Sequence, residues 1–135
     1  MNKINDYKDL LVWQKAMNLV VEVYKTTKML PKEETYGLSD QMRRAAVSIP
    51  SNIAEGYGRQ TPKSYAQFLT VARGSAYELE TQILLCQKIH PLSSEIVKSL
   101  TTTISEIKNA NLYHQQTSPT TILITIDFCL LPFAL

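Results

Sequence analysis

Four separate stretches of this sequence repeat apolar residues at intervals of three and four, and helix-breaking residues separate one stretch from the next. They run from about residue 9 to 30, 36 to 56, 61 to 89 and 93 to 111. This spacing puts apolar side chains on one face of an α-helix, and short connections favour antiparallel neighbours. Because 135 residues suffice for one core, we predict an all-α protein. Its expected form is an antiparallel up-down-up-down four-helix bundle over residues 1–115, with a short apolar C-terminal tail over residues 116–135.

The first stretch carries the longest apolar pattern. We predict that its buried stripe consists of Leu10, Trp13, Met17, Val20 and Tyr24, widened by Val12, Ala16, Leu19 and Val23. Pro31 ends this helix, because the residue before a proline is disfavoured in the α conformation.

The second stretch contains a proline within its helical pattern. Pro50 removes one backbone hydrogen bond, which predicts a kink, and Gly56 and Gly58 are expected to end the helix. Asn52 and Glu55 lie near this kink and are expected to satisfy the carbonyl that Pro50 frees or a neighbouring helix end. A role for these two residues as a ligand-binding pair stays open.

The third stretch has a clear start. Thr61 is a typical N-cap, and Pro62 suits the first helical position, where its missing N–H is not needed. Gly74 in mid-helix costs about 1 kcal/mol relative to alanine, so we predict that another helix crosses closely there. Ser93 or Ser94 is expected to cap the fourth helix.

Positive charge concentrates in the middle of the chain, although the net charge is only +2. Residues 1–40 carry six basic and six acidic residues, residues 41–75 carry five and one, and residues 76–135 carry three and five. The middle segment therefore has a net charge of +4, and it holds all four arginines. Arginine suits bidentate contact with phosphates. The candidate nucleic-acid contacts are Arg43, Arg44, Arg59, Lys63 and Arg73.

A structural use of the same arginines is the alternative hypothesis. Arg43 or Arg44 would then pair with Glu55, Glu78 or Glu80, within a subunit or between subunits, in a structural or protein-interaction oligomer.

Catalytic and metal-binding patterns are absent from the sequence. It has no phosphate-binding loop, dinucleotide fingerprint or nucleophile elbow, so we expect neither an enzyme nor a cofactor. Cys86 and Cys129 lack metal-ligand spacing, and Cys86 in an apolar run is interpreted as a buried hydrophobe rather than a reactive thiol. His90 is expected to sit at a helix end and His114 in solvent.

The two ends of the chain bear on localisation. The N-terminus has no secretory signal pattern, so a cytoplasmic protein is expected. Residues 120–126 are typical of a β-strand, and the tail is too polar to cross a membrane. Packing of the tail on the bundle, pairing between subunits and an unstructured extension all stay open.

The segment Arg43–Arg59, RRAAVSIPSNIAEGYGR, resembles the bacterial four-helix-bundle family of S23 ribosomal proteins, also called 23S rRNA intervening-sequence proteins. Shorter stretches agree at residues 9–16 (DLLVWQKA), 36–38 (YGL) and 74–82 (GSAYELETQ), and the resemblance covers residues 6 to 90. The matching positions expected to serve structure are Pro50, Asn52, Glu55, Gly56 and Gly74.

The resemblance implies an assembly rather than an enzyme. It implies a homopentamer-like ring, and a related branch is the accessory protein of diversity-generating retroelements, which binds nucleic acid and a reverse transcriptase. We therefore expect a non-catalytic homo-oligomer that binds nucleic acid, RNA or DNA, most plainly a structured RNA of the 23S rRNA intervening-sequence type.

Overall fold

The computed structural model describes residues 4–115, which are helical throughout apart from short connections. Its elements are η1 (Tyr7–Asp9), α1 (Leu11–Thr27), η2 (Lys32–Glu34), α2 (Leu38–Gly58), α3 (Pro62–Ile89) and α4 (Ser94–Gln115). The prediction of an all-α four-helix bundle is confirmed. The strand predicted at residues 120–126, Cys129 and the rest of the tail lie outside the described residues.

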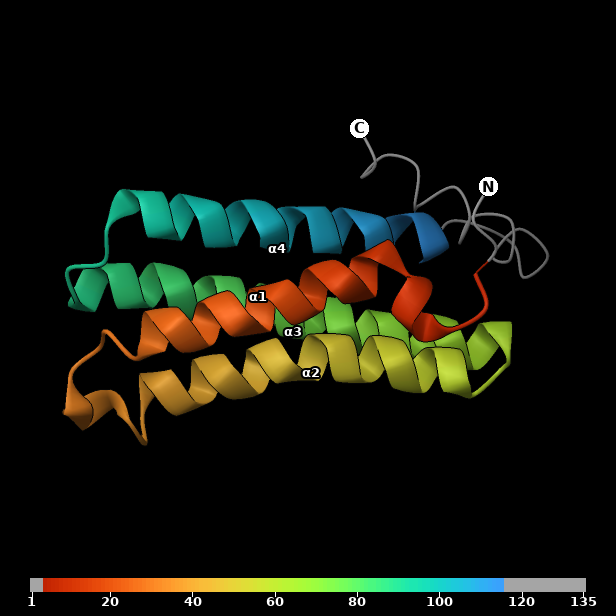
Figure 1. The fold of residues 1–135 in the computed structure, drawn as a ribbon, viewed down its shortest axis with the longest axis horizontal. Helices are drawn as coiled ribbons and strands as arrows, with labels where there is room; N and C mark the ends of the chain where they lie inside the picture. The colour runs from red at the N-terminus through yellow and green to blue at the C-terminus, as the bar shows by residue number, and fades with distance from the viewer. Residues whose placement is uncertain (1–3, 116–135) are drawn as a thin grey trace.

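The four α-helices lie along one another, and the chain reverses direction at each connection (Figure 1). Both α1 and α3 contact α2 and α4, whereas α1 and α3 do not contact each other. Helices α1 and α3 therefore occupy diagonal corners of the bundle. None of the helices in residues 4–115 is long and apolar enough to cross a membrane.

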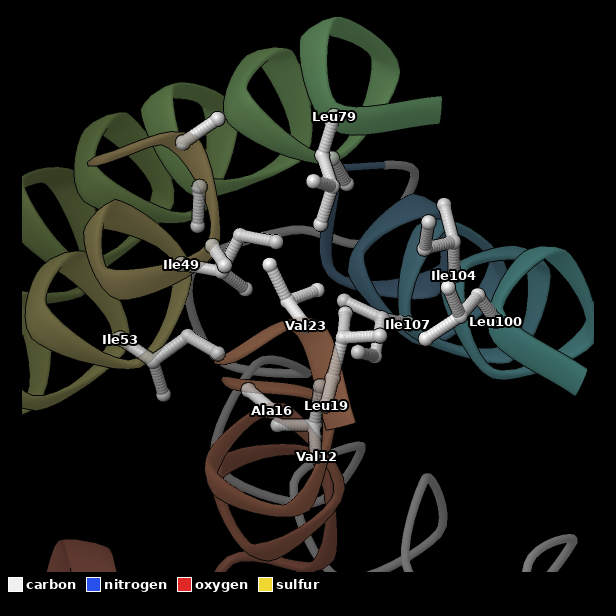
Figure 2. Close-up of a cluster of buried hydrophobic side chains, with 14 of the residues drawn as sticks. Val12, Ala16, Leu19, Val23, Ile49, Ile53, Leu79, Leu100, Ile104 and Ile107 are labelled. Atoms are coloured by element: carbon white, nitrogen blue, oxygen red, sulfur yellow. The ribbon is translucent and has the colours of Figure 1, made fainter. Parts of the chain in front are cut away.

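The core lies along the bundle axis, where aliphatic side chains from all four helices meet (Figure 2). Helix α1 contributes Val12, Ala16, Leu19 and Val23, whose buried side chains point to the centre of the bundle. The opposing residues labelled in Figure 2 are Ile49, Ile53, Leu79, Leu100, Ile104 and Ile107.

The predicted buried stripe of α1 is wrong in part. Met17 and Tyr24 are 42% and 40% exposed, whereas Ala16, Leu19 and Val23 are completely buried. Two overlapping apolar stripes share this helix, and spacing alone does not decide which one faces the core. The smaller aliphatic stripe does so together with Leu10, whereas Trp13 and Val20 are half-buried.

Helix α2 continues through Pro50 and ends at Gly58. The prediction that Gly56 ends this helix is wrong, because Gly56 is a buried helical residue. A Cβ atom at this position would lie 2.7 Å from Cβ of Phe68 in α3. Gly56 therefore lets the backbones of α2 and α3 approach closely.

The turn between α2 and α3 contains Gln60, the only non-glycine residue within the described residues that has a positive φ, at 58°.

Gly74 has no such role within the chain. A Cβ atom built on Gly74 has nothing within 4 Å, and the residue is exposed on the outside of α3. The predicted close helix crossing at Gly74 is therefore wrong for the single chain, and the crossing occurs at Gly56.

The predicted helix starts are confirmed. The Thr61 side chain accepts a hydrogen bond of 3.2 Å from the Ser64 amide, and Pro62 occupies the first helical position. Ser93 Oγ accepts a hydrogen bond of 3.3 Å from the Ile96 amide at the start of α4. These caps satisfy amides that have no partner inside their own helices.

Candidate nucleic-acid interface

Arg59 and Lys63 lie together at the connection between α2 and α3. Arg59 is the C-cap of α2, where its Nη2 atom lies 2.9 Å from Glu55 Oε1 and its guanidinium lies 5.4 Å from the ring centroid of Phe68. Lys63 is exposed in the first turn of α3, which carries no acidic residue. Free amides and the helix dipole add to the positive potential there.

Arg43 and Arg44 lie near the opposite end of the bundle, in the first turns of α2. Arg43 Nε donates a hydrogen bond of 2.8 Å to Thr27 Oγ1 of α1, and its guanidinium lies 4.8 Å from the ring centroid of Tyr24. Arg44 points into solvent, with its side chain 80% exposed and its Nε atom 3.0 Å from Asp40 Oδ2. The two adjacent arginines therefore differ in their contacts. Arg43 joins two helices, whereas the guanidinium of Arg44 is exposed and available to a ligand.

Arg73 lies midway along α3 on the side that faces α4. Its guanidinium is 5.6 Å from the ring centroid of Tyr77, and Lys108 Nζ of α4 is 4.4 Å from the same ring. Lys108 also forms an ion pair of 2.7 Å with Glu80. Lys108 therefore joins α4 to α3 through Tyr77 and Glu80, and Arg73 lies over the same tyrosine ring.

The five predicted cations do not form one compact cluster. Arg43 and Arg59 are sixteen residues apart on one helix, which corresponds to about 24 Å along its axis. The structure brings Arg59 and Lys63 to one end of the bundle and leaves Arg43, Arg44 and Arg73 elsewhere. Three of the four arginines lie over aromatic rings, namely those of Tyr24, Phe68 and Tyr77.

Sequence reasoning missed these aromatic rings. The contact of Arg73 with Tyr77 can be predicted from the sequence, because residues four apart are neighbours on the surface of a helix. The other two pairs join different helices, so only the tertiary structure reveals them.

The predicted ion pairs of Arg43 and Arg44 are wrong within the chain. Arg44 pairs with Asp40 and Glu55 pairs with Arg59, because residues four apart on one helix are already adjacent. Glu78 accepts a hydrogen bond of 3.2 Å from Gln82 Nε2. Pairing between subunits is not tested by a single chain.

A polar contact joins α2 to α3 in the middle of the bundle. Ser48 Oγ lies 2.8 Å from Ser75 Oγ, and Asn52 Nδ2 donates to the backbone oxygen of Ser48 at 2.7 Å and to its Oγ at 3.0 Å. Asn52 therefore does not serve the carbonyl of Ala46, which Pro50 frees. Its side chain instead reaches one turn back to Ser48, and Glu55 turns outward to Arg59.

His90 and Glu34 connect the two loops at the end of the bundle opposite Lys63. His90 is the C-cap of α3, as expected of a helix-end residue, and its Nε2 atom lies 2.8 Å from Glu34 Oε1. Glu34 Oε2 accepts a hydrogen bond of 3.0 Å from the Leu38 amide at the start of α2. The hydrogen bond from His90, followed by that from Leu38, lowers the pKa of Glu34.

Cys86 is completely buried, as the sequence predicts. Burial raises the pKa of its thiol, and the nearby charge of Glu34 raises that pKa further. A thiol of this kind is a poor nucleophile. Residues 4–115 contain no group of three or more His, Cys, Asp or Glu side chains that would hold a metal ion.

These features define a class of protein: a four-helix bundle in which three of the four arginines lie over aromatic rings. The chain belongs to the family of the 23S rRNA-intervening sequence protein, whose model matches residues 8–112. The recognition of this family from the segment Arg43–Arg59 is thereby confirmed.

One solved structure is similar over most of the chain. It is the 1.70 Å crystal structure of a protein with unknown function from the S23 ribosomal protein family of Bacteroides thetaiotaomicron VPI-5482. The two are 22% identical with a TM-score of 0.72, and the similarity covers 79% of this chain and 100% of the other. This likeness shows the shared fold. No curated protein matches the chain.

Proposed function

We propose that this protein is a non-catalytic, cytoplasmic homo-oligomer that binds structured RNA through phosphate contacts. The observation that carries the proposal is the pair Arg59 and Lys63, which are exposed at one end of the bundle beside the acid-free first turn of α3. The family name, which refers to 23S rRNA, favours RNA over DNA as the ligand.

Oligomerisation would let a chain of modest positive charge bind RNA. A single chain presents few cations at this end, and its net charge is only +2. A ring of identical subunits, such as the pentamer that the family resemblance implies, repeats the pair around one rim and adds its phosphate contacts together. Arg44 is exposed enough to extend the contact, whereas Arg43 and Arg73, like Arg59, contribute from positions over aromatic rings.

The phosphate mechanism has a measurable signature. Because cations on the protein release counterions from the nucleic acid, the affinity falls steeply with salt and varies little with sequence. We would titrate the full chain by fluorescence anisotropy against a structured RNA hairpin and a matched DNA duplex, at about 50 and 200 mM salt.

Substitution of the two cations tests the proposed contact. Arg59→Gln combined with Lys63→Gln should weaken RNA binding and flatten its salt dependence. Lys32→Gln combined with Lys98→Gln removes the same charge from exposed positions elsewhere and should change the affinity much less. Equal losses in the two double variants would overturn the site.

The alternative is an oligomer that binds only proteins. Exposed apolar side chains on α1 and α3 favour this second candidate, and a reverse transcriptase is the partner that the retroelement resemblance implies. No RNA or DNA binding by an intact oligomer at either salt concentration would favour this alternative.

A further inference from the structure

Gly74 on α3 has no packing role within the single chain. Glycine within a helix is less stable than alanine, yet nothing within the chain lies within 4 Å of a Cβ built on Gly74. Gly56, by contrast, has the Phe68 side chain against it. Gly74 thus opens the outer surface of α3 to a neighbour from outside the chain.

Most of the exposed large apolar side chains that the structure describes lie on two helices. Those on α1 are Met17, Val21 and Tyr24, and those on α3 are Val71, Tyr77, Leu84, Leu85 and Ile89. By the same measure, α2 has only Val47, and α4 has none from residue 94 to residue 110. The outer surfaces of α1 and α3 therefore have the composition of interface cores, whereas those of α2 and α4 do not.

The two apolar surfaces lie on opposite sides of the bundle. Helices α1 and α3 occupy diagonal corners and do not contact each other, so their outer surfaces face in opposite directions. One partner protein would cover only one of them, whereas successive copies of this chain cover both.

The two surfaces also lie at the same height along the bundle. Arg43 of α2 contacts Tyr24 and Thr27 of α1, and five residues further along α2 Ser48 contacts Ser75 of α3. Because α1 and α2 are antiparallel (Figure 1), Ser75 lies level with about residues 19 to 22 of α1. Gly74 is therefore within about one helical turn of the height of Val21.

The charges at the two surfaces are complementary. Between residues 64 and 87, all of which the structure describes, Glu78 is the only exposed charged side chain on α3. On the outer surface of α1, the exposed Lys25 forms an ion pair of 2.9 Å with Glu22, and the exposed Lys28 follows at the end of the helix. Lys28 on α1 is therefore the cation that matches Glu78 on α3.

We propose that the outer surface of α3, centred on Gly74, binds the outer surface of α1, centred on Val21, of the next copy of the chain. This inference rests on the oligomer in the proposed function and identifies its interface. Two different surfaces at one height give a head-to-tail contact with no translation along the bundle axis, and such a contact forms a ring when the rotation between neighbouring copies closes. Arg59 and Lys63 then recur on one rim.

Light scattering after size-exclusion chromatography of the full chain tests this interface. Gly74→Gln adds bulk where the single chain has open space, and Val21→Glu adds charge at a side chain that is 52% exposed. Each variant should keep the helical circular dichroism of the wild type and lose its oligomeric mass. The matched control is Val47→Glu on α2, 41% exposed, which should keep that mass.

Mixing the two variants distinguishes a head-to-tail contact from a symmetric one. Gly74→Gln retains an intact α1 surface and Val21→Glu an intact α3 surface, so an equimolar mixture should form a heterodimer and go no further. Wild-type protein that stays monomeric, variants that keep the wild-type mass, or a mixture that stays monomeric would each overturn the interface.

RNA anisotropy on the same samples separates this inference from the proposed function. Loss of mass in both variants, with no RNA binding by the wild type, would overturn RNA binding and leave the interface standing. If the wild type binds RNA and both variants keep the wild-type oligomeric mass, the interface is overturned and RNA binding stands.

Discussion

His90 Nε2 lies 2.8 Å from Oε1 of Glu34, and this contact joins residues 56 positions apart in the chain. Glu34 uses its other carboxylate oxygen to accept from the Leu38 amide. One carboxylate therefore holds the end of α3 and caps the start of α2, and both interactions favour its ionised form.

We predict that Glu34 makes stability sensitive to acid. Because its folded-state pKa lies below the ordinary glutamate value of about 4.5, its contribution to stability is complete above that value and is lost as pH falls through the lower folded-state pKa. Urea unfolding at a series of pH values from 7 to about 3 measures this effect. Glu34→Gln should have a shallower loss of stability in acid than the wild type, and Glu33→Gln, exposed beside it, should resemble the wild type. If the free energy of unfolding of Glu34→Gln falls with pH as steeply as that of the wild type, the role of Glu34 is contradicted.

We predict that Gly56→Ala destabilises the bundle by about 1–3 kcal/mol. The added methyl group would meet Cβ of Phe68 at 2.7 Å, so α2 and α3 would have to move apart. Gly58→Ala, with nothing within 4 Å of the new atom, is the matched control and should be neutral or slightly stabilising. Urea unfolding compares the two, and equal stability of both variants would exclude the close approach at Gly56.

We predict that the two apolar stripes of α1 differ in their contribution to stability. Leu19→Ala removes a buried side chain and should cost about 2–5 kcal/mol in the free energy of unfolding. Met17→Ala removes an exposed side chain and should change that free energy by less than about 1 kcal/mol at a protein concentration that keeps the variants monomeric. A larger loss of stability in Met17→Ala than in Leu19→Ala would show that the stripe containing Met17 faces the core.

The features that the sequence predicts correctly are those with local causes. Thr61 and Pro62 start α3 because capping and a fixed φ act within a few residues. The close approach that the sequence predicts at Gly74 occurs at Gly56 instead, because the role of a glycine in a helix depends on which other helix packs against it. That information is absent from the sequence around either residue.

The candidate site is predicted less completely than the fold. The excess of basic residues in the segment 41–75 locates the cations but not their partners. Arg43 and Arg44 are adjacent in sequence, yet one contacts α1 and the other points into solvent. A helical step of 100° separates them, and only the packing of α1 against α2 decides which of them becomes structural.

This difference predicts opposite phenotypes for Arg43 and Arg44. Arg43→Ala removes the hydrogen bond to Thr27 and the contact with the Tyr24 ring, and should lower the free energy of unfolding by about 1–2 kcal/mol. Arg44→Ala breaks one exposed ion pair and should cost less than about 0.5 kcal/mol. In the anisotropy titration at low salt the order should reverse, because the exposed guanidinium of Arg44 can reach a phosphate without first leaving a partner helix. Urea unfolding and RNA titration of both variants measure the two effects, and variants that change stability and affinity in parallel would show that neither arginine is specialised.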